Sequence, residues 1–300
     1  MLNSAQAKPS ARALGRILGC QPEDLPTLPA TAMQLNKLAS DDKASVQDLA
    51  QVINRDPPLA ATLLKVANSP FFKPQEPVTE VGRAVVILGF KEVCNLALGL
   101  TILASSGGLG PLKRRIQRQD LWRHSLVTGL LTDLLAREDL GLGSGHYIHG
   151  LLHDLGKVAL DAFRPEDVGR LLAAIEKEQR DWNSLEDEIT GVDHGFVGQM
   201  ILDYWDLPQD LVTAVGLHHR PWEAGPHQDQ AGLVCLANYL ARRMGYHSFA
   251  GESGLEEDPT AMEPMQAFFA KRGWDPERVL KTRIEQGLEQ TLASVQAIGI

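Results

Sequence analysis

Residues 45–70 read SVQDLAQVINRDPPLAATLLKVANSP and predict two short helices with a break between them. The apolar residues from Val46 to Ile53 recur every three or four positions, which is the spacing of one helix face. Ser45 is the expected N-cap, and Asp48 places a carboxylate near the positive end of that helix. The expected breaks are the proline-containing tripeptides Asp56-Pro57-Pro58 and Asn68-Ser69-Pro70. This stretch therefore favours helices over strands.

The same helical spacing extends over most of the chain, and we predict an all-α fold. Alternation of polar and apolar residues, typical of strands, is nearly absent. Residues 85–88 (VVIL) are the best strand candidate, but helical patterning flanks them and we interpret them as a buried helix turn. Residues 105–111 (SSGGLGP) are typical of a linker. An apolar stripe over residues 279–295 predicts a C-terminal helix that packs on the body or on a partner.

Composition limits the class of protein. The 300 residues carry a net charge of −9, are 44% hydrophobic and include three cysteines, which are far apart. This excludes disorder, a disulfide scaffold and a cysteine zinc site, and argues against a general nucleic-acid surface. No stretch resembles a membrane span or a signal peptide. We expect a cytoplasmic protein that binds neither nucleic acid in general nor a membrane.

Histidines are concentrated in one part of the chain, with seven of the nine between His124 and His219. The strongest motif is residues 151–157, LLHDLGK, in an apolar helical run. Neutral imidazole and carboxylate groups are good ligands for transition metals. The candidate ligands are His124, His153, Asp154, His194, His218 and His219. Any one of them alone is more often an ordinary residue, but together they favour a metal site.

Four of these candidates form two pairs of sequence neighbours, His153-Asp154 and His218-His219. Neighbours on a helix point about 100° apart, so we expect the members of each pair to face different ions. A carboxylate then bridges two metals about 3.5–4 Å apart. His146 and His149 share a helix face with His153, but we expect neither to coordinate. His146 is placed near an exposed helix start, and His149 in a packing or supporting role.

Taken together, these residues resemble the HDOD branch of the HD superfamily of metal-dependent phosphohydrolases. The resemblance covers about residues 20–245. Its motifs are Leu25-Pro26-Thr27-Leu28-Pro29, Asp56-Pro57-Pro58-Leu59, Leu64-Lys65-Val66-Ala67-Asn68-Ser69, Ala84-Val85-Val86-Ile87-Leu88-Gly89, Leu121-Trp122-Arg123-His124-Ser125, His194-Gly195-Phe196-Val197-Gly198, Trp205-Asp206-Leu207-Pro208 and His218-His219. It implies a two-lobe helical architecture with an HD-like core in the second lobe. The expected units are an N-terminal lobe (1–110), a metal-site lobe (111–245) and a C-terminal loop and helix (246–300).

The layout is also similar to the HD-GYP phosphodiesterases, which implies further roles. Lys157 would face a phosphate, Asp120 could be an additional ligand, and Arg220 could help to steer the phosphate. Asn238 stands where the last HD ligand is normally an aspartate, and its neutral amide is a weaker ligand. The Gly-Tyr-Pro segment that should follow His218-His219 is missing, so recognition of cyclic di-GMP cannot be carried over.

Two functions follow from the resemblance. The favoured one is a bacterial signalling module that keeps an HD-type site and acts through a protein partner, a nucleotide or another phosphate-containing small molecule, with self-association as a further option. The alternative is a metal-dependent phosphohydrolase or phosphodiesterase, in which Asp154 and Lys157 are catalytic and a di-metal site activates water. Both imply a divalent transition metal, most simply two ions. Iron or manganese is favoured by analogy, and zinc or nickel also suits the donors.

Overall fold

The computed structural model describes residues 10–72, 74–105, 116–252, 263–286 and 288, and within them the predicted all-α fold is confirmed. No strand occurs among these residues, and none of their helices is long and apolar enough to cross a membrane. The α-helices are α1 (Ala11–Leu18), α2 (Ala30–Ala39), α3 (Val46–Asn54), α4 (Pro57–Ala67), α5 (Val81–Leu88), α6 (Phe90–Ser105), α7 (Arg118–Glu138), α8 (Tyr147–Leu152), α9 (Leu155–Phe163), α10 (Pro165–Glu178), α11 (Trp182–Thr190), α12 (His194–Tyr204), α13 (Gln209–Gly216), α14 (Gln228–Arg243), α15 (Glu263–Arg272) and α16 (Pro276–Glu285).

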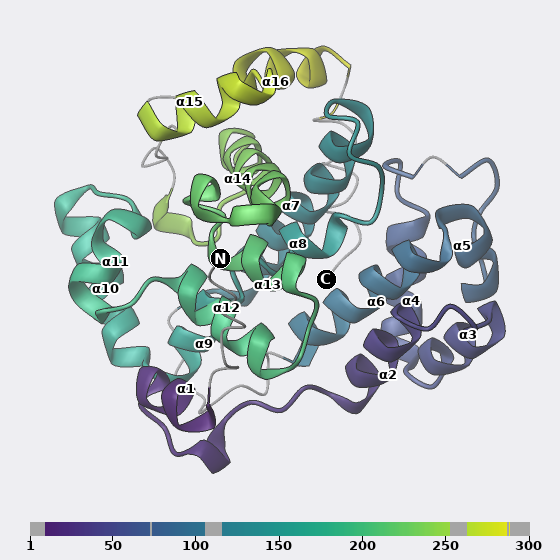
Figure 1. The fold of residues 1–300 in the computed structure, drawn as a ribbon, viewed down its shortest axis with the longest axis horizontal. Helices are drawn as coiled ribbons and strands as arrows, with labels where there is room; N and C mark the ends of the chain where they lie inside the picture. The colour runs from purple at the N-terminus through teal and green to yellow at the C-terminus, as the bar shows by residue number, and fades with distance from the viewer. Residues whose placement is uncertain (1–9, 73, 106–115, 253–262, 287, 289–300) are drawn as a thin grey trace, which may run out of the picture.

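Helices α2 to α6 pack on one another and form the blue and purple side of the molecule (Figure 1). The expected signals set their ends. Ser45 and Asp48 form a reciprocal capping box at the start of α3. Asp56 caps α4, accepting a hydrogen bond from Leu59 N at 3.1 Å, and the two prolines follow it in the first turn. Residues 85–88 lie inside α5, so their interpretation as a helix turn is confirmed. Their expected burial was wrong, because only Val85 is buried, whereas Val86 is 68% exposed and Ile87 is 37% exposed.

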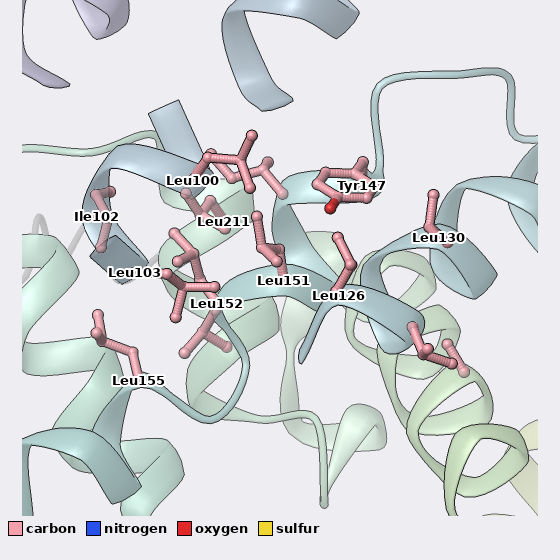
Figure 2. Close-up of a cluster of buried hydrophobic side chains, with 14 of the residues drawn as sticks. Leu100, Ile102, Leu103, Leu126, Leu130, Tyr147, Leu151, Leu152, Leu155 and Leu211 are labelled. Carbon is pink, nitrogen blue, oxygen red and sulfur yellow. The ribbon is translucent and has the colours of Figure 1, made fainter. Parts of the chain in front are cut away.

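The remaining helices pack mainly around α7 and α14, with α8, α9, α12 and α13 beside them. Helix α6 joins the two groups because it packs on α8. Figure 2 shows the buried side chains at this junction, from α6 (Leu100, Leu103), α8 (Leu151, Leu152) and α13 (Leu211). Burying a leucine side chain contributes about 1.5–3 kcal/mol. A dry leucine core therefore fixes α8 against its neighbours just before the His-Asp motif.

The two ends of the described chain both pack on the second group of helices. Helix α1 contacts α9 and α12, and the chain then crosses below the molecule to α2 (Figure 1). Helix α16 packs on α14, and Arg283 binds Asp139 and Glu138 at the end of α7 with nitrogen–oxygen distances of 2.7 Å. The expected linker after residue 105, the 110/111 boundary and the last part of the apolar stripe lie outside the described residues.

Candidate metal centre

The His-Asp pair lies between two helices and not inside one, so the sequence-based placement was wrong. Helix α8 ends at Leu152 and α9 begins at Leu155, which leaves His153 and Asp154 in the turn between them. A contact between α9 and α12 in the tertiary structure causes this break. Gly156 N is close to Gly198, and a Cβ at Gly156 would overlap the His194 carbonyl oxygen, so α9 starts directly against α12. The turn places Asp154 Oδ1 3.3 Å from His194 Nε2 of α12, and His153 Nε2 3.2 Å from His124 Nε2 of α7.

Six predicted ligands come together as two groups of three. His124, His153 and Asp154 form one group, and His194, His218 and His219 form the other; within each group the donor atoms all lie within 4.8 Å of one another. Each pair of sequence neighbours contributes both of its members to one group, so the helical geometry behind their expected separation does not hold. His153-Asp154 and His218-His219 lie in turns after α8 and α13, where the 100° helix step does not apply.

Asp154 lies between the two groups. Its Oδ1 is 3.4 Å from His153 Nε2 and 3.3 Å from His194 Nε2, and its Oδ2 is 3.6 Å from His124 Nε2. Oδ1 is buried and accepts no hydrogen bond among the described residues. A carboxylate that faces two sets of imidazoles has the arrangement of a ligand shared by two ions.

Hydrogen bonds at Nδ1 orient four of the five imidazoles. Three Nδ1 atoms face backbone carbonyls: His124 that of Tyr246 at 2.8 Å, His153 that of Gly150 at 2.7 Å, and His218 that of Val215 at 2.7 Å. His194 Nδ1 lies 2.7 Å from Glu186 Oε2. A carbonyl or carboxylate only accepts, so each Nδ1 carries the proton and each Nε2 presents a bare lone pair.

These lone pairs converge at short range. His124 Nε2 lies 3.2 Å from His153 Nε2, and His194 Nε2 lies 3.4 Å from His218 Nε2. Burial lowers the pKa of His124 and His218 and brings the pKa of His153 to about 3, so protons do not relieve the repulsion near neutral pH. Burial alone would raise the pKa of Asp154, but the adjoining His153 and Lys157 hold it well below its usual range. The donors therefore fit cations.

His219 differs from the other four imidazoles. Its Nδ1 lies 3.4 Å from Asn183 Nδ2, while Asn183 Oδ1 is buried with no hydrogen-bond partner. A half-turn of the Asn183 amide would let Oδ1 accept from His219 Nδ1 and free Nε2 as a ligand. In the orientation present, the amide donates, so His219 donates from Nε2 toward His194 Nε2 at 3.3 Å. The orientation of the Asn183 amide thus decides whether His219 Nε2 is free to bind a metal ion or donates a hydrogen bond to His194.

Glu186 on α11 was missed by sequence reasoning. It is 1% exposed, and its Oε2 accepts from both the Nδ1 and the backbone N of His194, at 2.7 and 2.9 Å. The signal was available, because Glu186 follows Trp182 by one turn and shares the apolar face with Leu185. A carboxylate on the buried face of a helix is expected to have a specific partner.

The remaining predicted residues lie in different surroundings. Lys157 is buried and donates to Asp154 Oδ2 at 3.0 Å. Asn238 on α14 is 5% exposed, and its Oδ1 has no hydrogen-bond partner among the described residues. Arg220 is half-exposed and pairs with Asp193 at 3.2 Å, at the start of α12. Asp120 is partly buried in the first turn of α7, and no described hydrogen bond or ion pair joins it to the donors.

His146 and His149 lie outside both donor groups. His146 is the N-terminal cap residue of α8 and is partly buried, so its expected exposure was wrong. His149 is buried, and its Nε2 lies 3.4 Å from Asp210 Oδ2 at the start of α13. This pair ties α8 to α13, the two helices that precede the ligand-bearing turns.

The HDOD domain family model matches residues 25–221, which is most of the chain. The chain belongs to the HDOD family. An HDOD domain protein of unknown function from Geobacter sulfurreducens superposes with a TM-score of 0.74 at 23% identity, over 92% of this chain and 94% of that one. A candidate signal transduction protein from Marinobacter aquaeolei VT8 gives a TM-score of 0.71 at 25% identity, over 92% of this chain and 60% of that one.

A longer curated relative is an uncharacterised protein of Treponema pallidum (strain Nichols). It is 25% identical over 245 residues, which are 80% of this chain and 45% of that protein. The chain thus spans less than half the length of this relative. The shared HDOD fold brings together donors from α7, from the α8–α9 turn, from α12 and from the turn after α13.

Proposed function

We propose that this chain is an HDOD signalling module with a buried centre for two divalent transition-metal ions, acting through a protein partner. The position of Asp154 between two groups of histidine donors carries the proposal. The orphaned Oδ1 of Asp154 and the protonated Nδ1 atoms of four histidines support it, because they leave one oxygen and four nitrogens available for cations. Iron, manganese, zinc and nickel all accept this donor set.

Burial favours a structural or sensing role over turnover. His153 is fully buried, His124, Asp154 and His194 are each 1% exposed, and Lys157 is 3% exposed. A phosphate ester cannot reach the donors in this conformation. Metal bound to buried ligands adds its binding free energy to that of folding. The centre would thereby couple metal supply to the stability of the surface that a partner recognises.

The alternative function is a metal-dependent phosphohydrolase, and Lys157 favours it. A buried ammonium 3.0 Å from the carboxylate between the two donor groups is suited to a phosphoryl oxygen. Bound divalent ions would supply Lewis acidity and a water of lowered pKa. Asp154 and the histidines would hold those ions, and Lys157 would orient the phosphate. Asn238 in place of a carboxylate reduces the negative charge available to the ions.

Metal analysis of the purified protein tests the proposal. We expect more than one equivalent of transition metal, a marked fall in melting temperature on chelation, and loss of both in His153→Ala. His227→Ala is the matched control, because His227 ends a short 3-10 helix and belongs to neither donor group. Less than about half an equivalent of metal, with none taken up on reconstitution, would overturn the metal centre.

Hydrolysis of bis-p-nitrophenyl phosphate by the metal-loaded protein separates the two functions. Absence of turnover supports the signalling module. Turnover that disappears in His153→Ala and rises in Asn238→Asp supports the phosphohydrolase, while turnover indifferent to both changes indicates a contaminant.

A further inference from the structure

A short segment after α14 covers the donors. Residues Tyr246–Glu252, here called the strap, contact the site at four points. Tyr246 accepts from His124 Nδ1, Ser248 accepts from Lys157 Nζ at 3.1 Å, the Phe249 ring lies 5.4 Å from that of Trp182, and Glu252 pairs with Arg242. Two of these contacts are with polar groups of the site itself, His124 and Lys157, so the strap covers the site.

Glu252 is the charged end of the strap. It is 1% exposed, and its Oε2 accepts from Ser248 N and Oγ at 2.8 and 2.7 Å. Its Oε1 lies 3.5 Å from Arg242 Nη2. Burial raises the pKa of Glu252, but Lys157 and Arg242 outweigh this and bring it to about 2. A carboxylate anion is therefore held between two cations, directly at Arg242 and through the Ser248 hydroxyl at Lys157.

Arg242 is not fully satisfied by this contact. The residue is 7% exposed, yet its Nε and Nη2 have no hydrogen-bond partner among the described residues. Buried polar groups are nearly always hydrogen-bonded, and a guanidinium offers five donors in a fork that matches a phosphate. Arg242 also lies one turn after Asn238 on α14, so it is on the same face as the orphaned amide oxygen. The Arg242 donors without partners fit an anion that offers more acceptor oxygens than the single Glu252 oxygen now beside Arg242.

The charges of the buried residues near the donors also favour a bound anion. In the metal-free protein three buried carboxylates, Asp154, Glu186 and Glu252, stand against two buried cations, Lys157 and Arg242. The histidines and Asn238 are neutral ligands, so each divalent ion would leave positive charge to be neutralised. Buried charges need a partner close by, and Glu252 is committed to Ser248 and Arg242.

We propose that Lys157 and Arg242 form a phosphoryl-anion subsite beside the metal donors. When the strap is closed, its Glu252 carboxylate occupies this subsite. A phosphate group replaces the Glu252 carboxylate, takes the free Arg242 donors and displaces Ser248 from Lys157. The strap then leaves His124 and Trp182. Phosphate binding thereby changes the surface formed by residues 246–252. The metal ions of the proposed function add attraction, but the subsite consists of Lys157 and Arg242.

Titration of the metal-loaded protein with inorganic phosphate, followed by calorimetry and ³¹P NMR, tests the subsite. We expect Glu252→Gln to bind phosphate about tenfold more tightly than the wild type, because the competing charge is gone. Adding Arg242→Gln to that variant removes the gain. Asp229→Asn is the matched control and leaves the phosphate affinity unchanged, since Asp229 pairs with Arg272 at 2.6 Å in the first turn of α14, at the opposite end of that helix from Arg242.

Glu252→Gln leaves a buried arginine without its counter-ion and could prevent folding. Ser248→Ala is the second variant, because it releases Lys157 from the strap and keeps every charge. It is expected to bind phosphate about threefold more tightly, with faster hydrogen exchange in residues 246–252. Unchanged affinity in Ser248→Ala, or a gain that survives Arg242→Gln, overturns the subsite. Metal content measured on the same samples reports on the proposed function separately.

Discussion

Asp154 Oδ1 lies 3.3 Å from His194 Nε2, so a carboxylate in the α8–α9 turn touches the first residue of α12. This contact joins the two groups of candidate metal donors. It depends on the close approach of two backbones, because Gly156 of α9 faces the His194 carbonyl group. The geometry of the centre is therefore sensitive to changes that do not touch a ligand.

Gly156→Ala is expected to weaken metal binding by about tenfold and to destabilise the protein by about 1–3 kcal/mol. Its Cβ would overlap the His194 carbonyl oxygen and lie 2.9 Å from Gly198 N, and neither backbone atom can move freely. The measurement is a metal titration together with urea unfolding. Gly82→Ala is the control, because its Cβ would meet only Val46 Cγ1 at 4.0 Å. Equal metal affinities in the two variants would contradict the prediction.

Glu186→Gln is expected to reduce metal affinity about 10–100-fold, the usual effect of losing a partner that orients a ligand. Glu186 holds the His194 ring through Nδ1, and a neutral amide orients it less strongly. Calorimetric metal titration measures the change. Glu188→Gln on the same helix is the matched control, because the Glu188 side chain is 69% exposed. The orienting role is wrong if both variants keep the wild-type affinity.

Asn238→Asp is expected to raise metal affinity about tenfold or more, since a carboxylate replaces a neutral amide whose Oδ1 has no partner. The same change should lower the stability of the metal-free protein by about 1–3 kcal/mol, because it takes a further carboxylate out of water. Metal titration and urea unfolding in chelator measure the two effects. Asn95→Asp is the control, since Asn95 donates to Gly145 O away from the donors. An Asn238→Asp variant with unchanged metal affinity would place Asn238 outside the centre.

The metal-free protein is expected to lose stability as the pH falls below about 6.5. The pKa of His153 falls from 6.5 in the unfolded chain to about 3 when folded, so between these values only the unfolded chain holds the proton. The free energy of unfolding then falls by up to about 1.4 kcal/mol per pH unit for each such histidine. Urea unfolding in chelator across this pH range measures the slope. His153→Ala should make the slope shallower, and a free energy of unfolding that does not change with pH would refute the burial argument.

Helix ends were predictable where residues close together in the sequence decide them. The Ser45–Asp48 capping box and the proline pair after Asp56 act through local backbone hydrogen bonds, so neighbouring residues are enough to infer them. The turn at His153-Asp154 was not predictable in this way. Its residues fit a helix locally, and the contact of Gly156 with α12 overrides that preference.

The sequence by itself determined the helical class, the HDOD resemblance and the choice of six candidate donors, because periodicity and residue chemistry are local properties. Only the tertiary structure decided which donors share a group, that Glu186 orients His194, and that Glu252 lies between Lys157 and Arg242. These relationships join residues from different helices and turns. Their distances depend on how leucine-rich helix faces and glycine contacts pack, and the chain order of the residues does not encode that packing in any one segment.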